Sequence, residues 1–86
     1  MGLKKGTTLI STKDRKALIQ LGARIKEIRE KKNLTVYDLT GEDLLIKSRQ
    51  HWQKIELGKM SITFTTFLKV AKSLGVSPIE LLKGIL

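Results

Sequence analysis

One short helix predicted from the sequence gathers strong hydrogen-bonding side chains on a single side. At 100° per residue, four of them share one exposed face: Arg49, Gln50, Gln53 and Lys54. Cationic side chains suit the O6 and N7 atoms of guanine, and Gln amides suit N6 and N7 of adenine. The pattern therefore favours a helix shaped to read the major groove of duplex DNA, and a merely solvated helix face is the alternative.

The other side of this helix is apolar and predicts how it is held. Trp52 and Ile55 point inward by the same period, so Trp52 is expected in the core rather than stacked on a base. Ser48 is a suitable N-cap, and Gly58 is suited to end the helix. We therefore expect the helix at about residues 48–57.

The rest of the chain predicts four further helices and no strand. We expect them at 12 to about 33, at 36–39 after the Thr35 cap, from Ser61 or Thr63 to Gly75, and from Ser77-Pro78 to about Gly84. Glu80 is placed to complete a capping box with Ser77. The fold class expected is all-α, and the connection 42–47 has no clear assignment.

Apolar residues in two further regions predict buried or interface positions. In the fourth helix the inward positions are Phe64, Phe67, Leu68, Ala71 and Leu74. The C-terminal region is more apolar than one core-facing stripe requires, at Ile79, Leu81, Leu82, Ile85 and Leu86. We favour a dimer surface there, and the alternative is that the tail folds back on the core.

Composition restricts the class of protein. The 86 residues suffice for one domain, and 17 Lys and Arg against 8 Asp and Glu give a net charge of +9, which favours an anionic partner. There is no Cys, and His51 is the one His, so we expect no metal and no cofactor. The acids include no convincing pair with a His or nucleophile, so an enzyme is not expected. No apolar run is long enough for a membrane span, and we expect a cytoplasmic protein.

Three segments together resemble a known family. LGARIKEIREKKNLT, the run from Ile55 to Lys59, and FLKVAKSLGVSPIELL are similar to the Xre/phage-repressor (Cro/repressor-like) helix-turn-helix family over about residues 20–83. The resemblance implies a five-helix repressor-like domain, which we place at 12–86. Residues 1–11 contain Gly, Thr and Lys without a helical period and are expected to form a flexible basic arm. The resemblance also implies double-stranded DNA as partner and a homodimer on a pseudo-palindromic operator, which we expect to form through the C-terminal helix.

The resemblance also assigns roles by position. Base contacts fall on the outward residues of the third helix already named. Phosphate contacts fall on Ser48, Lys59 and Ser61, and Arg29 with Glu56 resembles the internal salt bridge of the family. Two departures stand out: Val36 replaces the Gln that usually contacts phosphate, and the stretch from Leu39 to Ile55 is about two residues longer than usual.

The function that we favour is that of a sequence-specific transcriptional regulator, and two other functions remain as alternatives. Proteins of similar appearance also serve as antitoxins, in which a protein partner is neutralised. Basic charge alone fits RNA as well, although aromatic residues are only 5% and give no evident stacking platform. Lysines and arginines before residue 17 could follow phosphates, or could belong to a terminus without fixed structure.

Overall fold

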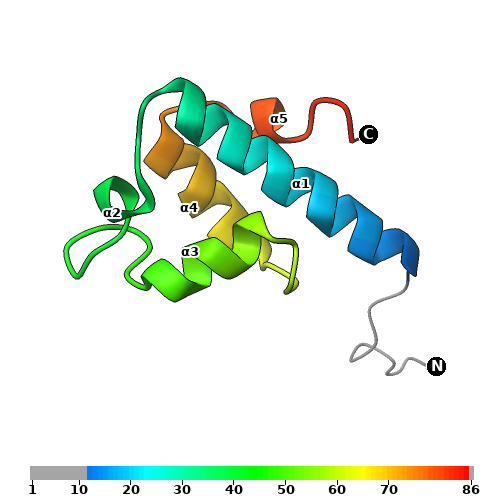
Figure 1. Cartoon of the computed structure of the whole chain (residues 1–86), viewed down its shortest axis with the longest axis horizontal. Helices are drawn as coiled ribbons and strands as arrows, with labels where there is room; N and C mark the ends of the chain where they lie inside the picture. Colours follow the sequence, from blue (N-terminus) through cyan, green and yellow to red (C-terminus); the bar gives the residue numbers. More distant parts are fainter. Residues whose placement is uncertain (1–11, 86) are drawn as a thin grey trace.

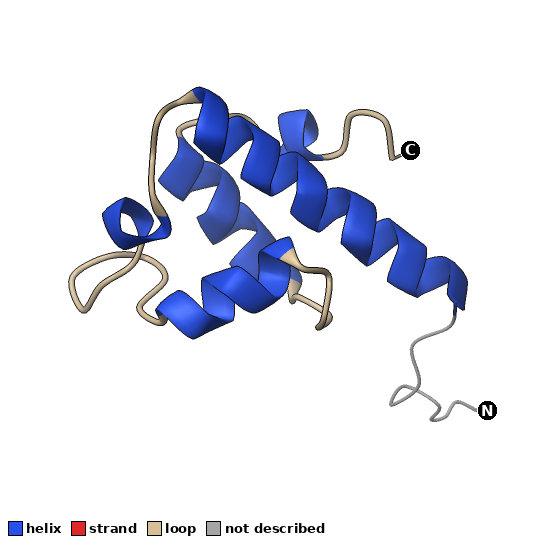
Figure 2. Cartoon of the chain, in the orientation of Figure 1, coloured by secondary structure: helices blue, strands red, loops and turns tan. Residues whose placement is uncertain are grey.

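The computed structural model describes residues 12–85, and the expected arm at 1–11 lies outside the described residues. The described chain forms five helices: α1 Thr12–Lys31, α2 Val36–Leu39, α3 Arg49–Glu56, α4 Phe64–Leu74 and α5 Pro78–Leu81 (Figure 1). The expected all-α class is confirmed, and the only pairing of extended backbone within 12–85 is an isolated bridge (Figure 2).

Local capping chemistry explains where the helices begin and end. Thr35 and Asp38 form a capping box at the start of α2, with each side chain bonded to the backbone N–H of the other. Ser48 caps α3 by accepting a hydrogen bond from the N–H of His51, and Thr63 caps α4 in the same way. At the C-terminal ends, the left-handed conformation falls on Asn33 after α1 and on Gly75 after α4.

The core joins all five helices around Trp52. Its most completely buried side chains are Trp52, Ile25, Leu74, Leu81 and Val70. α1 contacts α3 on one side and α5 on the other (Figure 1). Helix α3 is therefore fixed to α1, the longest of the described helices. The apolar side chains of α3, Trp52 and Ile55, are buried in this contact region.

The unassigned connection between α2 and α3 is anchored by its own buried residue. Thr40 and Ile46 form the parallel bridge, in which the N–H of Gly41 donates to the carbonyl of Ile46 over 3.2 Å. Ile46 is buried, while Leu44 and Leu45 between them are exposed. The bridge joins the two ends of the long connection, so the position of Ser48, two residues after Ile46, is fixed.

Two expectations for α4 were wrong. Phe64 is 73% exposed and stacks on Phe67 with ring centroids 6.5 Å apart, and Leu68 is 40% exposed. Val70, which the assigned face omitted, is buried instead. A helical period fixes the direction of a face but does not say how far along the helix its partners extend.

The C-terminal expectations need a similar correction. α5 ends at Leu81, and residues 82–85 form turns rather than more helix. Ser77 makes no side-chain cap, and the carboxylate of Glu80 pairs with Arg24 and Lys83 instead of completing a capping box. Leu81 belongs to the core and is not part of a surface, and Leu86 lies outside the described residues.

Two glycines allow α1 and the end of α3 to approach closely. A Cβ on Gly22 would lie 2.4 Å from the carbonyl oxygen of Glu56, and a Cβ on Gly58 would lie 2.6 Å from the Cα of Ile19. Gly58 also has a φ of +68°, which disfavours other residues. Any side chain at either position would push α1 away from α3.

Candidate nucleic-acid interface

α3 turns its hydrogen-bonding side chains to the surface. Arg49, Gln50, Gln53 and Lys54 are all exposed, while Trp52 and Ile55 behind them are 0% and 3% exposed. Ser48, Arg49, Gln50 and Gln53 together line an open hollow of about 420 Å³. This surface offers cationic and amide donors and contains no acid, which is the chemistry that base edges and phosphates accept.

The predicted phosphate residues stand at the two ends of α3. Ser48 lines the hollow at its start, and its hydroxyl oxygen already accepts the 3.1 Å bond from the backbone of His51. Lys59 and Ser61 are exposed in the connection from α3 to α4, where the N–H of Lys59 donates to the carbonyl of Lys54. A hydroxyl therefore lies at the start of α3, and a cation and a second hydroxyl follow its end.

Arg29 and Glu56 join α1 to α3 through a two-point contact. Nε of Arg29 donates to one carboxylate oxygen of Glu56 at 2.7 Å, and its Nη2 donates to the other at 3.1 Å. The side chains are only 12% and 7% exposed. The hydrogen bond with Glu56 raises the pKa of Arg29, so the guanidinium stays charged throughout the pH range of a folded protein.

The same contact extends into the core and into the turn after α1. Nε1 of Trp52 donates to Glu56 at 2.6 Å, and Nη1 of Arg29 donates to the carbonyl of Leu34 at 2.8 Å. The bond from Trp52 was not expected from the sequence, although the i,i+4 spacing of Trp52 and Glu56 could have indicated it. Three donors on one carboxylate fix the rotation of α3 about its own axis.

Tyr37 is a surface residue that the sequence analysis missed. The guanidinium carbon of Arg49 lies 3.8 Å from the centre of the Tyr37 ring, and Tyr37 is 70% exposed. A cation held against an aromatic face loses part of its freedom, so α2 restricts the first side chain of α3. No spacing rule connects residues on two helices across a long loop, so the sequence carried no signal for this pair.

Two other features, a metal-binding cluster and a membrane-spanning helix, are absent from the described part of the chain. Residues 12–85 contain no group of three or more His, Cys, Asp or Glu that could hold a metal ion. None of the helices described is long and apolar enough to cross a membrane.

Helix α3 exposes cations and amides, is held by its buried side, and is preceded by the short helix α2. This arrangement is that of a helix-turn-helix DNA-binding domain. The family model described as "Helix-turn-helix domain" matches residues 22–86, and the chain belongs to this family. It is a family of DNA-binding regulators and not of enzymes, and the resemblance to Xre/Cro-like proteins is confirmed.

A solved structure gives the same result. The chain is similar to the restriction-modification controller protein C.AhdI from Aeromonas hydrophila, with 30% identity and a TM-score of 0.67. The similarity covers 74% of this chain and 94% of that protein. No curated protein matches the chain.

The Arg29–Glu56 contact gives a stability prediction. Glu56→Gln should lower the free energy of unfolding by about 3–5 kcal/mol, because the partly buried Arg29 loses its counter-charge. Urea unfolding followed by the fluorescence of Trp52, the single Trp of the chain, measures this. Glu27→Gln is the matched control: it breaks exposed ion pairs with Arg24 and Lys31 and should cost less than about 1 kcal/mol. Equal losses in the two variants would contradict the assigned importance of Glu56.

Proposed function

We propose that this protein is a sequence-specific transcriptional regulator that reads the major groove of duplex DNA with α3 and its flanks, about residues 48–57. The observation that carries the proposal is the division of α3 into two sides. Its back is fixed by Trp52, Ile55 and the Glu56 contact, whereas its cationic and amide side chains have no role in the core. The likeness to a restriction-modification controller protein supports control of gene expression as the role.

Within this proposal the roles of the surface residues differ. Base edges are contacted by Arg49, Gln50, Gln53 and Lys54, and phosphates by Ser48, Lys59 and Ser61. The first group lies on the outward face of α3, where side chains can enter a groove. The second group stands at the ends of α3, where backbones border a groove. Residues 12–86 are proposed to form the DNA-binding domain.

Substitutions in the two groups should have different signatures. Arg49→Ala or Gln50→Ala should weaken binding by about 1–3 kcal/mol and relax the preference at one base pair, because a base-edge contact is lost. Lys59→Ala should weaken binding to all sequences alike, because a phosphate carries no sequence information. Titration against a duplex selected from a random library and against its scrambled version separates the two. If Arg49→Ala loses equally on both duplexes, Arg49 does not read a base.

Tyr37 should act on specificity through Arg49. Tyr37→Leu removes the aromatic face and should reduce discrimination at the base pair read by Arg49 by roughly two- to fivefold, as an exposed cation–π contact contributes about 0.5–1 kcal/mol. Tyr37→Phe keeps the ring and should retain the discrimination. Competition titrations with single-base variants of the selected duplex measure both. An unchanged profile for Tyr37→Leu, or an equal loss for Tyr37→Phe, would reject this role.

A homodimer completes the proposed mode of binding. One short helix reads few base pairs, so two copies on a pseudo-palindromic operator would supply the specificity that a genome demands. A two-fold dimer would set its recognition helices about 34 Å apart, one turn of DNA. The proposed contact lies at the C-terminal region, where Ile79 is 66% exposed. The antitoxin-like alternative stays a prediction, which co-purification of a stoichiometric protein partner would favour.

Sedimentation equilibrium tests the dimer surface. Ile79→Lys should weaken self-association roughly tenfold or more, since burial of an Ile side chain is worth about 1.5–3 kcal/mol. Leu44→Lys is the control, because it introduces the same charge at another exposed apolar position, in the connection before α3. A wild-type chain that stays monomeric, or an effect confined to Leu44→Lys, would rule out the proposed interface.

A further inference from the structure

α1 is longer than the part of the chain that matches the family. The helix begins at Thr12, whereas the family model begins at residue 22. The ten residues before the match add nearly three helical turns, about 15 Å of rise. Figure 1 shows that these first turns extend past the end of α3 and the connection that follows it. This extension contains Arg15 and Lys16.

A single stripe of α1 faces the α3 side along its whole length. Its positions recur at intervals of four and three: 15, 19, 22, 26 and 29. Arg29 binds Glu56 within this stripe, and Lys26 lines a hollow together with Gln53 and Leu57 of α3 and its C-cap. The stripe therefore follows α3 closely, and its direction is fixed by contacts rather than by the helical period alone.

The stripe continues beyond α3 to the connection that carries Lys59. Gly22 packs against the last carbonyls of α3, and Ile19 packs against Gly58, the residue directly before Lys59. Arg15 is the next position of the stripe, one turn further on. Since α1 is a continuous helix there, Arg15 continues this stripe toward the connection, whereas Lys16 continues the neighbouring stripe of Gln20, Ala23 and Glu27.

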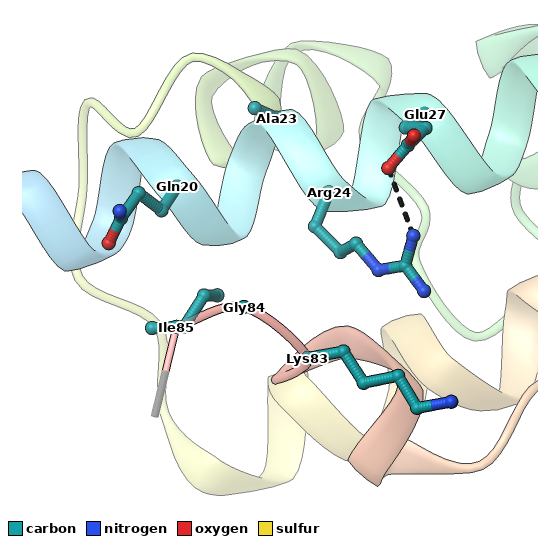
Figure 3. Close-up of a pocket in the computed structure, with 7 residues that line it drawn as sticks. All are labelled: Gln20, Ala23, Arg24, Glu27, Lys83, Gly84 and Ile85. Carbon is teal, nitrogen blue, oxygen red and sulfur yellow. Dashed lines mark hydrogen bonds and ion pairs between the residues drawn. The ribbon is translucent and has the colours of Figure 1, made fainter.

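The charge of Arg15 is available for a partner. Its side chain is exposed, and it forms no ion pair within residues 14–85. The opposite side of α1 differs, as Figure 3 shows: the C-terminal turn covers it, and Arg24 there is bound to Glu27. Arg24 also donates to the backbone of Glu80. Arg15 is thus a cation on the α3 side of α1 with which no acid within residues 14–85 forms an ion pair.

We propose that the N-terminal extension of α1 is a second phosphate-binding element, in which Arg15 binds the DNA backbone next to the phosphates bound by the connection after α3. The occupant is the phosphodiester chain of duplex DNA, because the same edge leads directly into the cationic face of α3. The inference rests on the proposed function and enlarges the area of DNA that each copy would cover.

The salt dependence of binding measures this element. Each phosphate neutralised by a cation releases counterions and contributes about −0.9 to the slope of log K against log salt concentration. The variant Arg15→Gln should therefore make the slope shallower by about 0.9. Its order of preference among sequences should remain that of the wild type, since phosphate contacts carry no sequence information.

The experiment uses the full chain and a long mixed-sequence DNA duplex, titrated over a series of salt concentrations. Lys72→Gln is the matched control: it removes the same charge from an exposed lysine of α4 that forms no ion pair within residues 14–85. This control should change the slope much less, because charges beyond about 10 Å from the DNA are screened. Circular dichroism of both variants establishes that the helices persist.

The outcomes separate the inference from the function on which it rests. A wild-type chain that binds no duplex DNA rejects the proposed function itself. A wild-type chain that binds, combined with an unchanged slope for Arg15→Gln, overturns this inference alone. An equal loss in the control variant also overturns it, because the effect would then belong to net charge and not to position.

Discussion

The position of α3 depends on one carboxylate, that of Glu56, which accepts hydrogen bonds from the core and from α1 at once. Trp52 approaches it from within α3, and Arg29 approaches it from α1 while also binding the carbonyl of Leu34. A partly buried charge is tolerated only when it is paired and hydrogen-bonded, and here both conditions are met. Because the carboxylate belongs to the last residue of α3, the bonds define the rotation of the helix as well as its place. The outward face of α3 is a consequence of this contact.

Because the inward side of α3 holds the helix in place, its outward side chains are free of any role in the fold. Hydrophobic packing and the Glu56 contact use every inward position, so no outward side chain is needed for stability. Arg49 is the exception in part, because the ring of Tyr37 restrains it at 3.8 Å. Such a restraint lowers the entropy that a long cationic side chain would lose on binding. The approach of α1 to α3 at Gly22 and Gly58 keeps the same frame tight, since a Cβ at either glycine would meet backbone atoms.

The helices and their ends could be predicted because they depend on local chemistry. Thr35, Ser48 and Thr63 accept hydrogen bonds from residues three further on, and this relation is visible in the sequence. The predictions that were wrong or missing concern residues whose contacts are made with distant parts of the chain. The pattern at Ser77 and Glu80 was that of a capping box, but Ser77 makes no side-chain cap, and the Glu80 carboxylate pairs with Lys83 and with Arg24, 56 residues earlier. Phe64 had the period of a core residue and lies exposed, and the Tyr37–Arg49 pair crosses a loop whose path no local rule defines. The outward placement of the α3 side chains followed from periodicity, whereas their restraint by α2 did not.

Charge is distributed unevenly around the proposed DNA-binding face, and this bears on how DNA would be held. At the start of α2 the carboxylate of Asp38 binds the N–H of Thr35, and this hydrogen bond lowers the pKa of Asp38, which is therefore ionised at neutral pH. Val36 is the position at which the resemblance to repressor-like proteins implied a phosphate-binding Gln, and Glu42 and Asp43 follow in the next connection. The acids on this side repel a phosphate, whereas the cation of Lys59 attracts one. Under the proposed function, Arg15 in the added turns of α1 would supply a phosphate contact on the side of Lys59, where α2 offers none.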